Sequence, residues 1–228
     1  MALTDSLISY WPLDEASGNA LDAHGANELT ETGGTIASAT GKVGNARDFE
    51  AGDTESFQHA DNADLSTGNI DFTFAAWVNA ESLADFPVIS HKGWGGSGIR
   101  EWVLYYDTSA GRLTFSVSDD GDSTAGTVQA DNFGALSTGT WYHVVWWHDS
   151  VNNQLGIAVN AGTPNTFSYS AGLGDRAGTF EIGASSVDQS LYWGGLFDEV
   201  GFWKRVLTSD ERTDLYNSGA GRAYSYFQ

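Results

Sequence analysis

A two-residue alternation of apolar and polar side chains runs through much of the chain and restricts it to β-structure. In residues 70–80, the side chains of Ile70, Phe72, Phe74 and Val78 fall on one face of an extended chain, with polar residues between them. This period is typical of strands buried on one face only. A helix would need apolar residues three and four positions apart, and this segment lacks that pattern.

The run TWYHVVWWHD at 140–149 is apolar on both parities. It therefore predicts a central strand that is covered on both faces. Turn-forming clusters of Gly, Asp, Ser and Asn separate it from the other alternating segments. Further strands are expected at 6–12, 44–49, 55–59, 86–91, 101–107, 112–118, 124–130, 154–159, 178–184 and 195–204. This spacing favours a two-sheet antiparallel sandwich.

One helix is predicted near the end of the chain. Thr208 and Glu211 have the spacing of a capping box, and Gly219 is expected to follow the last helical turn. No heptads, tandem repeats or Pro-rich linkers interrupt the pattern, so we expect a single domain over residues 1–228.

The charge of the chain excludes several classes of partner. Thirty Asp and Glu face ten Lys and Arg, which gives a formal net charge of −20. Nucleic acids and anionic membrane surfaces need clustered basic residues, so we expect neither as a partner. The 9 Trp, 9 Tyr and 12 Phe argue against disorder, and the absence of Cys excludes disulfides, zinc–thiolate sites and cysteine nucleophiles.

The sequence shows no export signal and no membrane segment. Its first 15 residues have no basic region and no long apolar run, and no stretch approaches the ~20 apolar residues of a spanning helix. The expected location is extracellular or on a virion, reached without a visible signal peptide.

Several sequence blocks occur in a characteristic order. They are LISYWPLDE at 7–15, GKVGNARDFE at 41–50 and, most specifically, DEVGFWKRVLTSDE at 198–211. Together they resemble the laminin-G-like, concanavalin A-like jelly-roll family, including its phage-encoded members. The resemblance extends over residues 6–219 and implies an all-β jelly-roll sandwich with one short C-terminal helix. It leaves function open, because this fold is shared by lectins, hydrolases, lyases and structural modules.

The motifs of known enzymes on this fold are missing. Related glucanases carry a Glu-x-Asp-x-x-Glu strand, which does not occur here, and the pair Asp198–Glu199 is adjacent, so that its side chains are expected on opposite faces of a strand. His143 and His148 are more simply interpreted as packed strand residues than as bases. We therefore expect no enzymatic activity.

The same resemblance implies a structural calcium ion between the loop after the first strand and an acid on the last strand. The corresponding residues are Asp22 and Asp198, with Asp14 and Asn19 as further ligands. Calcium prefers such carboxylate and amide oxygens on loops. The alternative is that these side chains cap turns by accepting backbone N–H groups. A second acidic loop, at 119–122, lacks the later Glu that an EF-hand requires.

Aromatic residues in Gly-rich loops indicate a binding surface. Trp94 lies in HKGWGGSG, and Tyr192 and Trp193 lie in SLYWGG. Their flat rings can stack on the C–H faces of sugars with little loss of entropy. Two alternatives are a lid over the ends of the sandwich and a subunit interface. Nearby residues that can bond sugar hydroxyls are His91, Lys92, Arg100 and Asp188. On the next expected strand, one parity of Trp102, Tyr105 and Tyr106 can extend the surface.

The leading hypothesis is a non-catalytic, lectin-like binding or adhesion module, stabilised by calcium. Its partner would be a neutral glycan or a host-surface polysaccharide. The alternative is a phage virion protein, such as a decoration, spike or tail-fibre component. Such a protein would contact other virion proteins and form an oligomer. The third hypothesis is a polysaccharide hydrolase or lyase with an unrecognised site.

Overall fold

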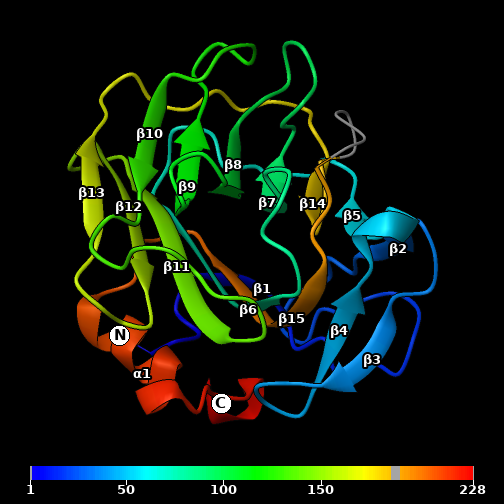
Figure 1. The fold of residues 1–228 in the computed structure, drawn as a ribbon. Helices are drawn as coiled ribbons and strands as arrows, with labels where there is room; N and C mark the ends of the chain where they lie inside the picture. Colours follow the sequence, from blue (N-terminus) through cyan, green and yellow to red (C-terminus); the bar gives the residue numbers. More distant parts are fainter. Residues whose placement is uncertain (1, 186–190, 228) are drawn as a thin grey trace.

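A computed structural model describes residues 2–185 and 191–227. In this part of the chain, fifteen strands form two antiparallel sheets packed face to face (Figure 1). The predicted all-β sandwich is therefore confirmed.

The eight-stranded sheet contains the longest strands. Its order is β13 (Asn165–Ser168), β12 (Gln154–Val159), β11 (Trp141–Asp149), β6 (Phe72–Ala80), β15 (Gly195–Trp203), β4 (Asn45–Phe49) and β3 (Ala37–Thr40), and β1 (Leu7–Trp11) also pairs with β15. The segment with apolar residues on both parities is β11, which lies between β12 and β6.

The seven-stranded sheet faces it. Its order is β10 (Gly126–Gln129), β9 (Arg112–Val117), β8 (Trp102–Asp107), β7 (Val88–Lys92), β14 (Phe180–Ile182), β5 (Ser56–His59) and β2 (Thr30–Thr32). Each predicted strand is present. The short strands β2, β3 and β13 were not predicted, because three or four mostly polar residues carry no detectable alternation.

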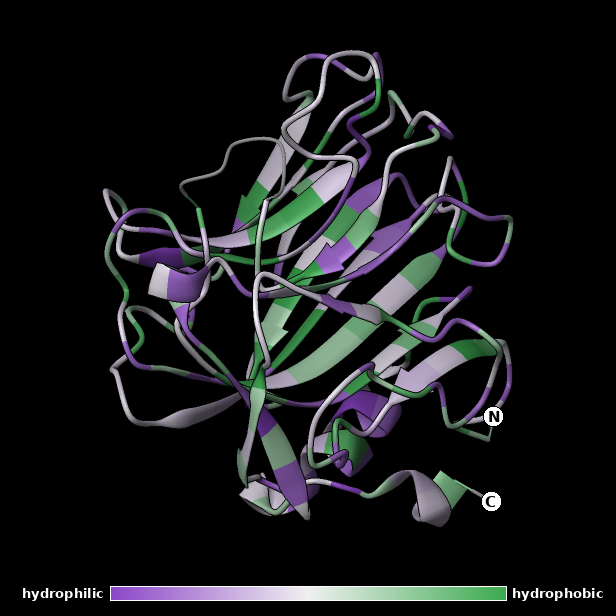
Figure 2. Ribbon diagram, turned by 90° about the vertical axis from the view of Figure 1, so that its right-hand side faces the viewer, coloured by the Kyte–Doolittle hydropathy of each residue, from purple (hydrophilic) through white to green (hydrophobic). Residues whose placement is uncertain are grey.

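Aromatic rings fill the space between the sheets. The ring of Phe74 stacks on Phe202 at 4.2 Å, on Trp146 at 5.4 Å and on Phe180 of the opposite sheet at 5.6 Å between centroids. Figure 2 shows the hydrophobic residues concentrated along the central strands and hydrophilic ones recurring in the loops. The inward parity of the strands thus forms one continuous core.

A second apolar cluster covers the outer face of the eight-stranded sheet. Helix α1 (Ser209–Tyr216) and both chain ends pack there, at the lower edge of Figure 1. Trp147 and Trp203 from the sheet lie under Leu215 and Phe227, and the guanidinium of Arg212 lies 4.6 Å from the Trp147 ring. This cover explains why β11 is apolar on both parities.

The ends of α1 agree only in part with the prediction. Thr208 and Glu211 form the expected capping box, but the left-handed residue that ends the helix is Asn217 rather than Gly219. Short 3₁₀ turns occur at Ala51–Asp53, Asn217–Gly219 and Tyr224–Phe227. Among the described residues, no helix is both long and apolar enough to cross a membrane.

Candidate functional site

An open groove of about 350 Å³ lies on the outer face of the seven-stranded sheet, over β7 to β10. The strand register places Val88 opposite Tyr105, Val103 opposite Ser116, and Ser116 opposite Thr127. These side chains form its floor because Trp102 and Leu104, on the other parity of β8, point into the core. The lining residues are Phe86, Val88, Trp94, Val103, Tyr105, Ser116, Thr124, Thr127 and Leu191.

The chemistry of this lining is apolar with a few hydroxyl groups. Trp94, Phe86 and Tyr105 supply aromatic rings, while Ser116 and Thr127 supply hydroxyls from neighbouring strands. Of the described lining residues, none is a carboxylate, histidine, lysine or arginine. Burial raises the pKa of Tyr105, so its phenol stays neutral at physiological pH. Such a lining suits a neutral ligand with both C–H and OH surfaces.

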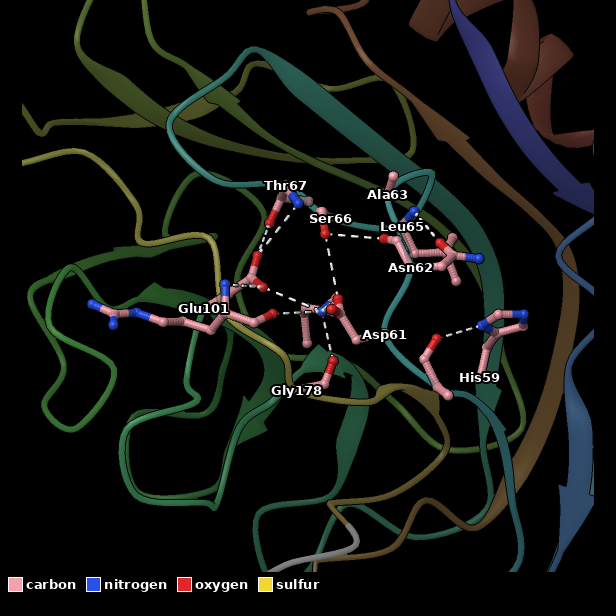
Figure 3. Close-up of polar contacts among 12 residues, drawn as sticks. His59, Asp61, Asn62, Ala63, Leu65, Ser66, Thr67, Glu101 and Gly178 are labelled. Atoms are coloured by element: carbon pink, nitrogen blue, oxygen red, sulfur yellow. Dashed lines mark hydrogen bonds and ion pairs between the residues drawn. The ribbon is translucent and has the colours of Figure 1, made fainter.

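Trp94 is carried by the loop between β7 and β8, and a buried ion-pair network closes the base of this loop. Lys92 and Glu101, at the two ends of the loop, are fully buried, with the Lys92 ammonium 3.2 Å from a Glu101 carboxylate oxygen. The ammonium also donates to Asp61 at 2.6 Å and to the Gly178 carbonyl at 2.5 Å. Figure 3 shows Asp61, Glu101 and Gly178 converging from different segments.

Glu101 is held equally firmly. One of its carboxylate oxygens accepts from the hydroxyl of Thr67, and the other accepts the backbone N–H of Arg176 at 3.0 Å (Figure 3). A buried charge is tolerated only when paired and hydrogen-bonded in this way. The expectation that Lys92 bonds a ligand is therefore wrong, because its three protons are used inside the protein.

The tip of the same loop is fixed by the acidic turn that follows β9. The Asp122 carboxylate accepts from the Ser97 hydroxyl at 2.6 Å and from the Gly98 N–H at 2.7 Å. Arg100 donates to the Asp122 carbonyl at 2.7 Å and places its guanidinium 5.5 Å from the Trp94 ring centre. The acidic turn thus positions Trp94 and Arg100.

The predicted aromatic residues divide into surface and core. Trp94 and Tyr192 are partly exposed, whereas Trp102 and Trp193 are fully buried. Trp102 packs on Phe74 at 4.7 Å between ring centres, so a ligand-contacting role for it is wrong. Trp193 is likewise a core residue, which supports the alternative of packing at the end of the sandwich.

His91 supports the groove from beneath rather than lining it. Its side chain is 1% exposed, and its Nδ1 accepts the backbone N–H of Trp94 at 3.0 Å. The Nε2 atom lies 3.4 Å from a carboxylate oxygen of Glu181. His91 therefore orients the start of the Trp94 loop, and direct contact with a ligand is wrong for this residue. Asp188 lies outside the described residues.

The predicted calcium ligands do not meet at one point. Asp22 accepts four backbone N–H groups, from Tyr10, His24, Gly25 and Asn27. Burial opposes ionisation of this carboxyl, but the four hydrogen bonds outweigh burial and lower its pKa. Asn19 is used by Glu28 and by the N–H of Glu31. Asp22 therefore caps a turn, and Asn19 joins its own segment to the one at 28–31, so neither fits a calcium ion.

Asp14 and Asp198 do come together, around the turn at 41–45. One oxygen of Asp198 accepts the N–H groups of Lys42 and Val43 at 2.7 and 2.8 Å, and Asp14 accepts that of Asn45 at 2.7 Å. The second oxygen of Asp198 is buried and has no hydrogen-bond partner among the described residues. This oxygen fits a cation, because calcium is bound by just such unpaired carboxylate oxygens.

Sequence reasoning missed one acidic group. Ligand oxygens of Asp48, Glu50 and Glu81 lie within 4.8 Å of one another, the only such group in residues 2–185 and 191–227. Burial raises the pKa of Asp48. The pKa of Glu81 is raised mainly by burial and further by the negative charges of Asp48 and Glu50. Asp48 and Glu50 are close in the sequence, but Glu81 is distant from both. It joins them because Gly195 of β15 pairs with Phe49 at the end of β4 and with Ala80 at the end of β6.

The fold is shared with several solved proteins. Domain 4 of AbnA, an extracellular GH43 arabinanase from Geobacillus stearothermophilus solved with arabinotriose, superposes with a TM-score of 0.73 at 20% identity, covering 92% of this chain and 97% of that one. The binding domain of botulinum neurotoxin DC, solved in complex with SialylT, superposes with a TM-score of 0.62 at 12% identity. The match covers 94% of this chain and 52% of that one. Trypanosoma rangeli sialidase superposes with a TM-score of 0.67 at 16% identity. The match covers 97% of this chain and 34% of the sialidase chain.

No curated protein sequence matches the chain. A family model does: the one for the concanavalin A-like lectin/glucanases superfamily, of laminin-G type, matches residues 51–211. That range contains β5 to β15 and the whole groove. The chain therefore belongs to the concanavalin A-like lectin/glucanase superfamily.

Proposed function

We propose that this protein is a non-catalytic, lectin-like module that binds a neutral glycan in the groove over β7 to β10. The observation that carries the proposal is the lining of this groove, where a firmly held Trp94 stands beside a floor of aliphatic and hydroxyl side chains.

The lining matches the two kinds of surface on a sugar. The rings of Trp94 and Tyr105 can cover the C–H face of a pyranose or furanose, and the hydroxyls of Ser116, Thr124 and Thr127 can exchange hydrogen bonds with its OH groups. The net charge of −20 favours a neutral ligand over an acidic one.

We propose a non-catalytic role because of the residues that line the groove. Glycoside hydrolysis needs two carboxyl groups roughly 5–10 Å apart across the scissile bond. The described lining of the groove supplies no carboxyl group. An activity screen on arabinan, β-glucan, agar and alginate tests this part, and release of reducing ends that tracks the purified protein would contradict it.

Two proteins of similar fold support glycan binding as the class of function. One is a domain solved with arabinotriose, and the other is a toxin binding domain solved with SialylT. A location where polysaccharides are displayed, outside the cell or on a virion surface, suits such a module, and we propose that location with it.

The decisive experiment compares the wild-type protein with Trp94→Ala on an array of neutral glycans, followed by calorimetric titration of the best ligand. We expect Trp94→Ala to weaken binding at least about tenfold, since central aromatic contacts contribute more than ~1 kcal/mol. Tyr226→Ala is the matched control, because Tyr226 is 53% exposed and adjoins Phe227, which packs on the outer face of the eight-stranded sheet. Equal binding by all three proteins, or no binding to any glycan, would contradict the proposal.

We also propose that a calcium ion bound at Asp198 and Asp14 stabilises the turn at 41–45. The support is the buried, unpaired oxygen of Asp198. Added Ca²⁺ should raise the melting temperature of the wild type at pH 8, EDTA should reverse this, and Asp198→Asn should respond to neither. If Asp198→Asn responds to Ca²⁺ as the wild type does, the ion binds elsewhere, and the Asp48, Glu50 and Glu81 group becomes the place to examine.

A further inference from the structure

A second hollow of about 300 Å³ adjoins the groove. Its lining is more polar than that of the groove and includes a carboxylate, two hydroxyl-bearing aliphatic residues and a phenol. The lining residues are Ala51, Gly52, Thr54, Ser82, Ala84, Asp85, Pro87, Tyr192 and Gly194.

The two hollows are lined by consecutive residues of the same two segments. Leu191 lines the groove, and its neighbour Tyr192 lines the second hollow. Phe86 lines the groove, while Asp85 and Pro87 on either side of it line the second hollow. We call residues 85–87 and 191–192 the ridge. The residues of the ridge therefore line both hollows.

The backbone of the ridge is held in an unusual conformation. Asp85 and Phe86 are consecutive residues with φ of 59° and 53°, and Thr54, across the second hollow, has φ of 59°. Residues with side chains rarely adopt this left-handed region, least of all a bulky one such as Phe. Strain of this kind persists at ligand clamps, where the geometry itself is used. Phe86, in this conformation, has a side chain that is 37% exposed and lines the groove.

We propose that the ligand is an extended neutral polysaccharide chain that runs from the groove over Phe86 into the second hollow. This inference rests on the proposed function and specifies the length of its ligand. Sugar units in the groove stack on Trp94, and the unit beyond the ridge bonds through its hydroxyls to Asp85, Ser82 and Tyr192. A mono- or disaccharide would occupy only one hollow.

The test is calorimetric titration with size series of neutral arabino-, xylo- and cello-oligosaccharides of two to six units. For the wild type, affinity should rise with length until both hollows are filled. Tyr192→Ala should leave the affinity for the shortest bound member within about twofold and weaken that for the hexasaccharide about tenfold, which corresponds to ~1.4 kcal/mol. Trp94→Ala should weaken binding of every length, and Tyr226→Ala, the matched control, should change none.

The outcomes separate the two proposals. If Trp94→Ala weakens binding but Tyr192→Ala affects either no length or all lengths equally, the extended ligand is wrong and the groove remains the site. If affinity does not rise beyond the disaccharide, the extended ligand is wrong as well. If the wild type binds no member of any series, the proposed function fails, and this inference fails with it.

Discussion

Asp198 and Glu199 are neighbouring acids on β15 that are both removed from water. Asp198 is fully buried and Glu199 is 5% exposed. They lie where the strand register shifts, and Glu199 has a φ of 51°, so the strict alternation of a strand does not hold here. Burial raises the pKa of Asp198 to about 7. The pKa of Glu199 is raised to about 9, mainly by burial and further by the negative charges of Asp198 and Asp14. With no cation bound, both carboxyls of the folded protein therefore hold a proton at pH 6 that the unfolded chain releases.

This difference predicts stability that decreases in alkali. In the unfolded chain these groups titrate near 3.8 and 4.5, so their contribution is complete below those values and is lost as the pH rises through about 7 and then about 9. His143 acts in the opposite direction, because burial lowers its pKa from 6.5 to about 3 and acid then favours unfolding. We expect the melting temperature, measured without calcium, to fall from pH 6 to pH 9.

Glu199→Gln should flatten this decline, because the amide carries no titrating proton. Asp53→Asn, at an exposed acid, is the matched control and should retain the wild-type profile. A melting temperature that stays constant or rises between pH 6 and pH 9 would show that Asp198 and Glu199 are ionised without cost in the folded state.

At the scale of elements, the loop between β7 and β8 is the structure on which the groove depends. Its base is closed by Lys92 and Glu101, and its tip is held by Asp122. Gly93 allows the chain to turn at the base, since a Cβ at this position would lie 1.9 Å from the Ile99 carbonyl. The loop thus reaches the ligand already ordered, which reduces the entropy lost on binding.

Glu101→Gln should destabilise the whole domain, because among the described residues it leaves the buried Lys92 with Asp61 as its only anionic partner. We expect a loss of about 2–3 kcal/mol in the free energy of unfolding, measured by urea denaturation. The matched control is Asp131→Asn, which breaks the exposed pair with Arg112 and should cost less than about 1 kcal/mol. Equal effects of the two changes would show that the Lys92 network is dispensable.

At the scale of the whole molecule, the charge of −20 is spread over a sandwich whose groove is uncharged. Charge repulsion acts against the compact state and is screened by salt. It does not act on a neutral ligand. Stability and binding should therefore respond differently to ionic strength.

Raising NaCl from 20 to 500 mM (about a fivefold shorter screening length) should increase the melting temperature of the free protein. The dissociation constant of a neutral oligosaccharide should change less than about twofold over the same range. A strong weakening of binding by salt would indicate a cationic ligand instead, and a lower melting temperature would show that ion pairs, rather than repulsion, dominate the surface.

Sequence alone predicted the architecture wherever alternation extends over six or more residues, as in β6, β8 and β11. The candidate site was predicted only in part, because burial depends on distant segments. Trp94 and Trp193 have similar Gly-rich surroundings, yet Trp193 is enclosed by core residues such as Phe197, 5.3 Å away between ring centres. Tyr105 lies on a strand whose parity was predictable, but no local signal shows that its face stays uncovered.

The packing of both chain ends on the eight-stranded sheet has a consequence for attachment. Leu3 and Phe227 belong to the cluster on the outer face of that sheet, whereas Trp94 and Tyr105 lie on the outer face of the other sheet. A tether joined to either end therefore approaches the molecule from behind the groove. Displayed on a bead, a fused partner or a larger assembly, the protein would present its groove outward.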